Sequence, residues 1–399
     1  MTDSSVLSTL PDLQAAELAH VMRVQDMIGE QIIAAGGWLG FADFMRLALY
    51  APGLGYYSAG ATKFGAAGDF VTAPEMSPLF GRCLARQCAE VLVHTGGDIL
   101  EFGAGSGVLA ATLLRELAEL AALPARYRIL EVSADLRERQ REHVGKLPAD
   151  LRARVEWLDR LPARAISGIV LANEVLDAMP VERFVVQHAP SGAPAIESLG
   201  VVLDSRGNLC ESRRPAPAPF AAAVTALLRE LPAALPSGYS SELCLELAPW
   251  VTSLGLMLER GVALLVDYGL PRRQLYHPDR AAGTLQCHFR HRAHADPLHY
   301  VGLQDITAWV DFTRVAEAAD AAELAVLGFV TQAGFLIGCG IDNVLAGAPT
   351  ERERLVQAGE ARRLMMPGEM GESFKVMALG RGFDRPLRGF AWQDLRGSL

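Results

Sequence analysis

Two periods of hydrophobic and polar residues alternate along this chain. Apolar residues at helical spacing predict helices, and short continuous apolar runs predict strands. Between residues 99 and 379 the two kinds of segment follow one another repeatedly, which is typical of an α/β protein with a parallel sheet. The predicted strands are 99–102, 128–133, 155–158, 167–173, 261–269, 328–331 and 374–379, and the predicted helices are 17–35, 41–49, 79–93, 108–120, 136–144, 304–318 and 332–345.

One stretch interrupts this order. Residues 183–204 alternate loosely between apolar and polar, which predicts an antiparallel hairpin that turns near Ser191 and Gly192. Residues 213–219 are rich in Pro and Ala, so we expect an exposed connector there. The chain from 183 to about 250 is therefore predicted to be an insertion in the parallel sheet.

The first strand of the predicted sheet leads into a glycine cluster. Residues 99–107 have the sequence ILEFGAGSG, and a helix is predicted directly after them. Glycines tolerate positive φ angles and let a ligand approach the backbone, and the amides at a helix start favour an anionic group. The spacing is G-x-G-x-G, whereas a dinucleotide fingerprint would place its third small residue at position 108, which is Val. A purely structural tight turn is the alternative.

Acidic and amide side chains follow several of the predicted strands. Glu131 ends the second strand, where an acidic residue can accept hydrogen bonds from ribose hydroxyls. Asn173, Glu174 and Asp177 follow the fourth strand, and Asp267 ends the fifth. The carboxyl ends of parallel strands border the ligand crevice, so these residues are candidates for a functional site. The alternative is that Asn173 caps a helix whose first turn carries Glu174 and Asp177.

The composition limits the classes of protein to consider. Half of the 399 residues are hydrophobic, enough for a sizeable core, and 37 Lys and Arg against 46 Asp and Glu give a net charge of −9. This charge argues against a general nucleic-acid binder. No apolar run is long enough to span a bilayer, no secretory signal is evident, and the six cysteines form no C-x-x-C pair. We therefore expect a cytoplasmic protein.

A histidine-rich tract raises the question of a metal site. His288, His291, His294 and His299 lie close together in the sequence, and such tracts can bind metal. The chain has no H-E-x-x-H motif, however, and its cysteines are scattered. We therefore expect no bound metal.

The G-x-G-x-G turn, with Glu101 two residues before its first glycine, resembles the cofactor turn of class I methyltransferases, and further segments resemble their MidA-like family. Val301 stands where many members have Pro, and Trp309 stands where many have His, which puts a direct role of position 309 in doubt. The similar segments span nearly the full chain: Phe41–Tyr57, Gly68–Gly81, Glu101–Gly107, Ala172–Pro180, Val266–Gly269, Asp305–Phe312 and Met370–Phe374.

The resemblance implies a fold and a cofactor. The fold is a seven-stranded class I methyltransferase sheet, which is Rossmann-like, and the cofactor is S-adenosylmethionine. We expect an N-terminal helical extension with a cofactor-covering loop over 1–95, a core over 96–182 and 255–399, and an inserted α+β segment on the substrate side over 183–254. His291 and His294 match family positions and are expected in a pocket or substrate groove. The expected cofactor-binding residues are Phe70, Thr72, Glu101, Gly103, Ala104, Gly105, Gly107, Glu131, Val132 and Asn173.

The resemblance also implies a protein substrate, because a mitochondrial member of the family acts on an arginine of a respiratory complex I subunit. A guanidinium is protonated in water, so carboxylates would have to orient it and accept its proton. Glu174 and Asp177 are the catalytic candidates, with Asp267 a more distant third. Three alternatives stay open: a non-catalytic S-adenosylmethionine-binding assembly factor, a nicotinamide-dependent oxidoreductase and a metal hydrolase.

Overall fold

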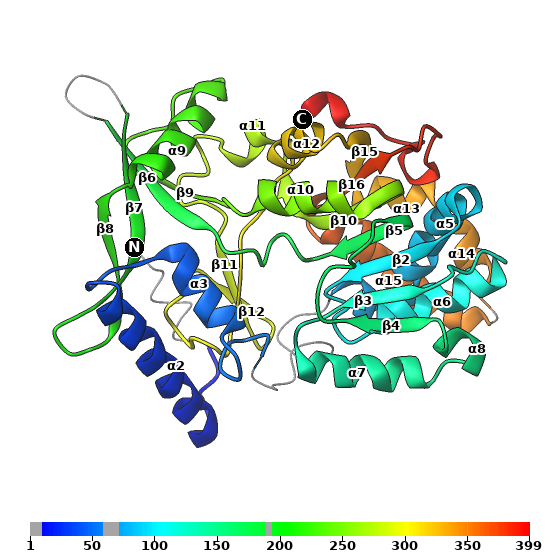
Figure 1. Ribbon diagram of the computed structural model, residues 1–399, viewed down its shortest axis with the longest axis horizontal. Helices are drawn as coiled ribbons and strands as arrows, with labels where there is room; N and C mark the ends of the chain where they lie inside the picture. Colours follow the sequence, from blue (N-terminus) through cyan, green and yellow to red (C-terminus); the bar gives the residue numbers. More distant parts are fainter. Residues whose placement is uncertain (1–9, 59–71, 189–193, 349) are drawn as a thin grey trace. The chain divides into compact units, whose positions relative to one another are not determined.

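The computed structural model describes residues 10–58, 72–188, 194–348 and 350–399. The chain forms two compact units that are interleaved along the sequence (Figure 1). The first contains residues 1–70, 178–246 and 272–309, and the second contains residues 71–177, 247–271 and 310–399. All candidate cofactor-binding and catalytic residues that the structure describes belong to the second unit.

A sheet forms the centre of the second unit. Its strands follow the order β15–β16–β10–β5–β2–β3–β4, and β14 pairs with β10 outside this series. The five strands from β10 to β4 are parallel to their neighbours, whereas β16 is antiparallel to both β10 and β15. This series confirms the predicted seven-stranded sheet. The strands are Asp98–Phe102 (β2), Tyr127–Leu130 (β3), Val155–Leu158 (β4), Ile166–Asn173 (β5), Leu258–Leu270 (β10), Val310–Asp311 (β14), Ala325–Thr331 (β15) and Phe374–Arg381 (β16).

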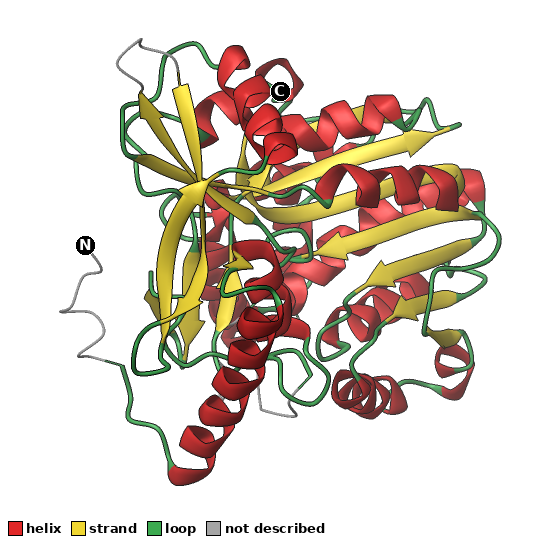
Figure 2. Cartoon of the chain, turned by 60° about the vertical axis from the view of Figure 1, so that its left-hand side comes forward, coloured by secondary structure: helices red, strands yellow, loops and turns green. Residues whose placement is uncertain are grey.

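Helices cover both faces of this sheet, as Figure 2 shows. α5 packs on α6 and contacts β5 and β10, while α10 packs on α12 and also contacts β10. Because both faces are covered, every residue from Gly261 to Asp267 is buried, which explains the continuous apolar run there. The helices of this unit are Ala73–Met76 (α4), Pro78–Thr95 (α5), Val108–Glu119 (α6), Ala134–Gly145 (α7), Ala149–Arg152 (α8), Leu247–Met257 (α10), Phe312–Ala321 (α12), Gln332–Gly338 (α13), Ile341–Ala346 (α14), Glu351–Met365 (α15) and Met370–Ser373 (α16), with 3-10 turns at Arg388–Phe390 and Arg396–Ser398.

Side-chain caps set the starts of five described helices of the second unit, α5, α7, α12, α13 and α15. Ser77 caps α5 by accepting the Leu79 amide at 3.1 Å, and Pro78 occupies the first helical position. Ser133 and Asp311 accept backbone amides in the same way at the starts of α7 and α12. The predicted helix start at Ser77 and Pro78 is thereby confirmed.

The first unit contains two smaller sheets. One has the order β1–β7–β6–β9, with β8 on β7, and the other has the order β12–β11–β13. Strands β6 and β7 pair antiparallel from Arg183–Leu199 to His188–Pro194, which confirms the predicted hairpin, although its turn near Ser191 lies outside the described residues. The elements are Ala15–Ala34 (α2), Leu39–Gly40 (β1), Phe41–Tyr50 (α3), Glu182–His188 (β6), Pro194–Leu203 (β7), Leu209–Pro215 (β8), Ala218–Glu230 (α9), Tyr239–Leu243 (β9), Arg272–Leu275 (α11), Gln286–Phe289 (β11), Arg292–His294 (β12) and Asp305–Thr307 (β13).

Several predictions differ from this structure. The expected connector at 213–219 is wrong in its first half, because β8 extends to Pro215 by pairing with β7. The helix predicted from residue 304 begins only at Phe312, since residues 305–307 pair with β11 and Asp311 caps the helix. Residues 272–309, assigned to the core from the sequence, pack within the first unit, and α5 packs within the second. No helix in the described part of the chain combines the length and apolar character that a membrane span requires.

Candidate functional site

The glycine turn joins β2 to α6. Gly103, Gly105 and Gly107 have φ angles of 58°, 54° and 86°, which L side chains rarely adopt. A Cβ atom at Gly107 would also lie only 2.9 Å from the Cα atom of Gln140 on α7. Glycine is therefore required both by the backbone conformation and by the close approach of α7 to the turn.

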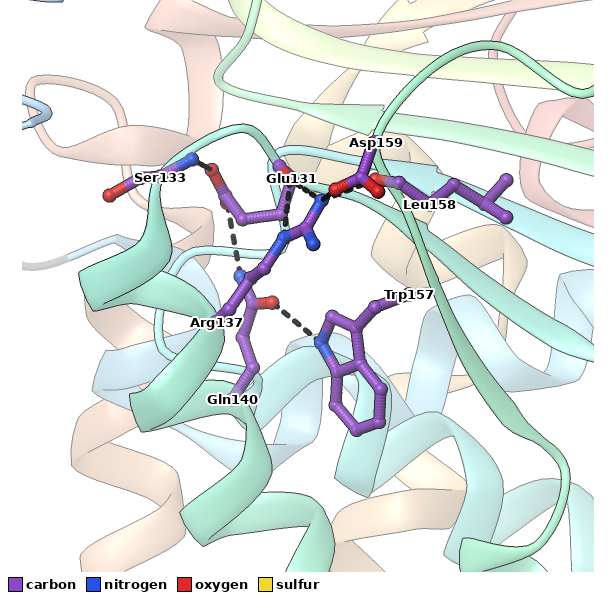
Figure 3. Close-up of polar contacts among 7 residues, drawn as sticks. All are labelled: Glu131, Ser133, Arg137, Gln140, Trp157, Leu158 and Asp159. Carbon is purple, nitrogen blue, oxygen red and sulfur yellow. Dashed lines mark hydrogen bonds and ion pairs between the residues drawn. The ribbon is translucent and has the colours of Figure 1, made fainter. Parts of the chain in front are cut away.

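Glu131 lies directly after β3 and has a solvent-exposed neighbour. Its side chain is 5% exposed, whereas Val132 is 80% exposed. One carboxylate oxygen accepts the Ser133 amide at 2.9 Å, and the other accepts the Gln140 side-chain amide at 3.0 Å (Figure 3). Burial raises the pKa of Glu131, and these two hydrogen bonds oppose that shift. Each carboxylate oxygen can accept a further hydrogen bond, so the group could still bind a diol.

Arg137 connects the ends of β3 and β4 beside this carboxylate. Its Nε donates to the carbonyl oxygen of Glu131 at 2.7 Å and one terminal nitrogen donates to the carbonyl oxygen of Leu158 at 2.8 Å. The same guanidinium forms an ion pair with Asp159 at 2.5 Å. The strand ends are thus fixed by a cation that binds main-chain oxygens and leaves the Glu131 carboxylate to neutral donors.

Glu101 is buried within β2, before the glycine turn. It is 2% exposed, and its carboxylate accepts the hydroxyl of Tyr127 on the adjacent strand β3 at 2.8 Å. Burial raises the pKa of Glu101 to about 7, the Tyr127 hydrogen bond lowers it, and the nearby Glu131 raises it further. The ionisation of Glu101 therefore depends on the charge of Glu131, the candidate ribose-binding residue.

A short segment before α5 contacts the glycine turn. The hydroxyl of Ser106, inside the turn, donates to the carboxylate of Glu75 on α4. Thr72, an expected cofactor residue, occupies the N-cap position of α4 and is 8% exposed. Phe70, the other residue expected from this segment, lies outside the described residues.

The acidic residues after β5 occupy a turn, so the alternative of a capped helix start is wrong. Asp267 on β10 explains the difference, because one of its oxygens accepts the amides of Val175, Leu176 and Asp177 at 3.1, 2.8 and 3.4 Å. These amides, which a helix start would leave for a cap, are held by a residue some 90 positions away in sequence. Glu174, at the beginning of the turn, has a φ angle of 54°, an uncommon conformation for a residue with a side chain.

Like charges lie close together at this turn. Burial, reinforced by the nearby Glu174 carboxylate, raises the pKa of Asp267, and the Leu176 amide opposes the shift. Burial and the carboxylates of Glu174 and Asp177 also raise the pKa of Tyr268. An arrangement of this kind favours a positively charged or proton-donating ligand beside it.

The turn after β5 adjoins the glycine turn. Strands β2 and β5 are neighbours in the sheet, and a Cβ atom at Gly103 would lie 3.6 Å from Val175. Asn173 donates to Glu174 at 3.0 Å, while its own Oδ1 is a buried acceptor without a hydrogen-bond partner among the described residues. The candidate cofactor residues and the candidate catalytic residues thus share one edge of one sheet.

The histidine tract belongs to the first unit. Burial lowers the pKa of His288, His294 and His299. Within the residues that the structure describes, no three His, Cys, Asp or Glu side chains are grouped so that they could hold a metal ion. The expected pocket role of His291 and His294 stays a prediction.

A model of a protein family described as S-adenosyl-L-methionine-dependent methyltransferases matches residues 83–330, more than half of the chain. The chain belongs to this methyltransferase family. The methyltransferase is also similar over its whole length to a solved structure from Burkholderia thailandensis that is bound to S-adenosyl-homocysteine. That structure is 43% identical, covers 98% of this chain and 100% of its own, and superimposes with a TM-score of 0.91.

Curated relatives extend the likeness to animals. The mouse protein arginine methyltransferase NDUFAF7, mitochondrial, is 29% identical over 87% of this chain and 82% of its own length. The human protein of the same name is 28% identical over 87% of this chain and 81% of its own. These relatives are mitochondrial proteins, so the expectation of a cytoplasmic protein is contradicted.

The methyltransferase uses S-adenosylmethionine as its cofactor and has the class I fold, as the resemblance implied. The site described above fits that molecule in three respects. The glycine turn leaves bare backbone, the Glu131 carboxylate can still accept hydrogen bonds beside the exposed Val132, and the unpartnered Oδ1 of Asn173 could accept from an ammonium group.

Sequence patterns missed several residues of this site. Gln140 and Arg137 form side-chain hydrogen bonds with the predicted Glu131, Trp157 donates to Gln140, and Glu75 accepts from Ser106 inside the glycine turn. Gln140 offered one signal, since it is a polar residue on the inward face of a helix that is otherwise strongly charged. The others have no distinguishing pattern in the sequence, because their partners depend on strand register.

Proposed function

We propose that this methyltransferase transfers a methyl group to an arginine side chain of a protein. Two observations support the proposal. The mouse and human relatives are named protein arginine methyltransferases, and two acidic residues, Glu174 and Asp177, lie in the turn after β5, whose amides Asp267 holds. Carboxylates are the groups that a guanidinium needs around it.

We further propose which residues hold the cofactor. Glu131 would accept hydrogen bonds from the ribose hydroxyls, and Val132 would contact the base. The glycine turn would lie against the rest of the S-adenosylmethionine molecule. Asn173 would accept a hydrogen bond from the ammonium group of the cofactor. The full set is Phe70, Thr72, Glu101, Gly103, Ala104, Gly105, Gly107, Glu131, Val132 and Asn173.

The chemistry divides between the cofactor and the chain. When bound, S-adenosylmethionine supplies a methyl group that its positively charged sulfur already activates. Glu174 and Asp177 would hold the acceptor guanidinium in line, draw its charge away from the reacting nitrogen and accept the proton that it must lose. The pKa of a guanidinium is above about 12, so this proton would stay in place without a carboxylate beside it.

The identity of the protein that accepts the methyl group is a more specific proposal. A respiratory-complex subunit is the first candidate, because the resemblance that the sequence shows includes an assembly factor for such a complex. The observation that carries the general proposal, the acidic turn beside the glycine turn, does not depend on which protein is modified.

The test is methyl transfer from labelled S-adenosylmethionine to the proteins of a cell extract, followed by acid hydrolysis and separation of the methylated amino acids. Labelled methylarginine, absent with the Glu174→Gln variant, is the expected result. Labelled methyllysine or another acceptor would contradict the arginine assignment. Cofactor binding without any transfer would instead favour a non-catalytic S-adenosylmethionine-binding assembly factor.

A further inference from the structure

We propose that Gln140 and Trp157 are positioning residues that hold the Glu131 carboxylate and the glycine turn in one fixed arrangement for ribose binding. The inference rests on the proposed role of Glu131, and it adds two residues that no sequence pattern assigns. It concerns which side chains make the carboxylate selective for a hydroxylated ribose.

Gln140 joins three parts of the site. It lies on α7 and is fully buried. Its Nε2 donates to the carbonyl oxygen of Gly105 at 3.1 Å and to the carboxylate of Glu131 at 3.0 Å. A side-chain amide has two N–H donors, so these contacts use both of them. A single side chain therefore ties the glycine turn to the carboxylate after the neighbouring strand.

Trp157 determines which way the Gln140 amide points. The indole Nε1 on β4 donates to Oε1 of Gln140 at 3.0 Å (Figure 3). An indole nitrogen can only donate, so the oxygen of the amide must face Trp157. The nitrogen then must face Glu131 and Gly105. Without the indole N–H, the amide could rotate and place its oxygen against the carboxylate.

Neutral donors matter at this carboxylate because Arg137, although its charge lowers the pKa of Glu131, donates its hydrogen bonds to other groups. Arg137 binds the carbonyl oxygens of Glu131 and Leu158 and the carboxylate of Asp159. The charged form of the buried carboxylate is therefore stabilised mainly by the amides of Ser133 and Gln140. Loss of the Gln140 donor would release one oxygen and let the carboxylate leave the orientation in which it meets two adjacent hydroxyls.

The test compares two ligands in calorimetric titrations: S-adenosylhomocysteine and its 2′-deoxyribose analogue. In the wild type, the analogue should bind at least about tenfold more weakly, because it lacks one of the two hydroxyls that Glu131 accepts. Gln140→Met keeps the approximate size of the side chain and Trp157→Phe keeps an aromatic ring, although a smaller one, and both remove the N–H donors. In both variants we expect weaker S-adenosylhomocysteine binding, by about three- to tenfold, and a discrimination between the two ligands of less than about threefold.

Trp392→Phe is the matched control, because Trp392 is 62% exposed near the C-terminus and should leave both affinities unchanged. The ratio of the two affinities separates positioning from general destabilisation, which would weaken both ligands equally. If the wild type discriminates and the Trp157→Phe and Gln140→Met ratios stay as large as its own, the positioning role is wrong. If the wild type itself does not discriminate, the assignment of Glu131 to the ribose fails, and this inference fails with it.

Discussion

Glu131 after β3 and Asp267 on β10 are both buried carboxylates at one edge of the sheet, but they bind different kinds of partner. Glu131 accepts the backbone amides of Ser133 and Val132 and the side-chain amide of Gln140, and a carboxylate has about four acceptor positions, so it can accept another hydrogen bond. Asp267 accepts three successive amides through one oxygen and the amide of Tyr268 through the other. Glu131 can therefore still accept hydrogen bonds from a ligand, whereas both oxygens of Asp267 accept backbone amides and fix the turn.

The two regions also differ in charge and strain. Around Glu131 the donors are neutral and a helix packs closely against the glycine turn. Around Asp267, the carboxylates of Glu174 and Asp177 lie nearby, and Glu174 has a φ angle of 54°. Strained backbone and like charges persist only where surrounding contacts enforce them. The comparison supports a division in which Glu131 and the glycine turn bind the cofactor, and the acidic turn after β5 carries out the reaction with the acceptor. The following substitutions test this division.

The largest expected effect is loss of cofactor binding in Gly105→Val. The φ angle of Gly105 is 54°, which a β-branched residue adopts only with strain, and in the proposed site its side chain would collide with the cofactor. We expect the affinity for S-adenosylmethionine to fall by more than about 100-fold in calorimetry, in a protein that still folds.

Gly207→Val is the matched control for that substitution. Gly207 has a φ angle of 85° in the turn before β8, and a Cβ atom there would meet nothing within 4 Å. Both variants should lose stability by about 1–2 kcal/mol from the backbone conformation, but only Gly105→Val should lose cofactor binding. Equal cofactor affinity in the two variants would remove the glycine turn from the cofactor site.

The next effect separates binding from reaction on the other side of the comparison. Glu174→Gln keeps the shape of the side chain and should leave cofactor affinity nearly unchanged, while turnover falls by about 100-fold or more, the usual size of a lost acid–base group. Titration and methyl transfer are measured on the same preparations, with the exposed Glu119→Gln as control. A parallel loss of affinity and activity would make Glu174 a binding residue instead.

The positions of the strands along the chain, the glycine turn and the position of Glu131 could all be predicted because each has a local signal, whereas the seven-stranded sheet was implied only by the family resemblance. Apolar runs mark buried strands, and positive φ angles select glycine at fixed spacing. The turn after β5 could not be predicted. Asn173 and Glu174 carry the local signals of a helix start, and only the three-dimensional neighbour Asp267 overrides them.

The contacts around Glu131 could not be predicted from the sequence for a related reason. Trp157 reaches Gln140 because β3 and β4 pair with Ile129 opposite Trp157, and this register cannot be read from either strand alone. The division of the chain into units was mispredicted at residues 272–309 because apolar periodicity shows that a segment is buried but not against which core.

A smaller effect is expected when Asp267 is substituted. The substitution tests whether this carboxylate shapes the turn or accepts the proton in the reaction. Asp267→Asn keeps one oxygen that can accept the amides of Val175, Leu176 and Asp177, but its NH2 group replaces the oxygen that accepts the Tyr268 amide. We expect turnover to fall by about tenfold and cofactor affinity by less than about threefold. A fall in turnover as large as that of Glu174→Gln, with unchanged thermal stability, would make Asp267 the proton acceptor and contradict the proposed division.

The smallest effect is expected at Glu101, on β2, and concerns the pH dependence of the stability of the ligand-free protein. Burial raises the pKa of Glu101 from its ordinary value of 4.5 to about 7. Between these values the folded protein keeps a proton that the unfolded chain releases, so the free energy of unfolding falls as pH rises through this window. A shift of this size corresponds to about 3 kcal/mol at most.

Glu101→Gln has no such proton, and its carbonyl oxygen can still accept the Tyr127 hydroxyl. Urea unfolding should therefore find the variant and the wild type about equally stable near pH 4, and the variant the more stable of the two above pH 7. The exposed Glu138→Gln should track the wild type at every pH. If the difference between Glu101→Gln and the wild type is the same at both ends of the pH range, the pKa of Glu101 is the same in the folded and unfolded protein, and its hydrogen bond with Tyr127 offsets the effect of burial.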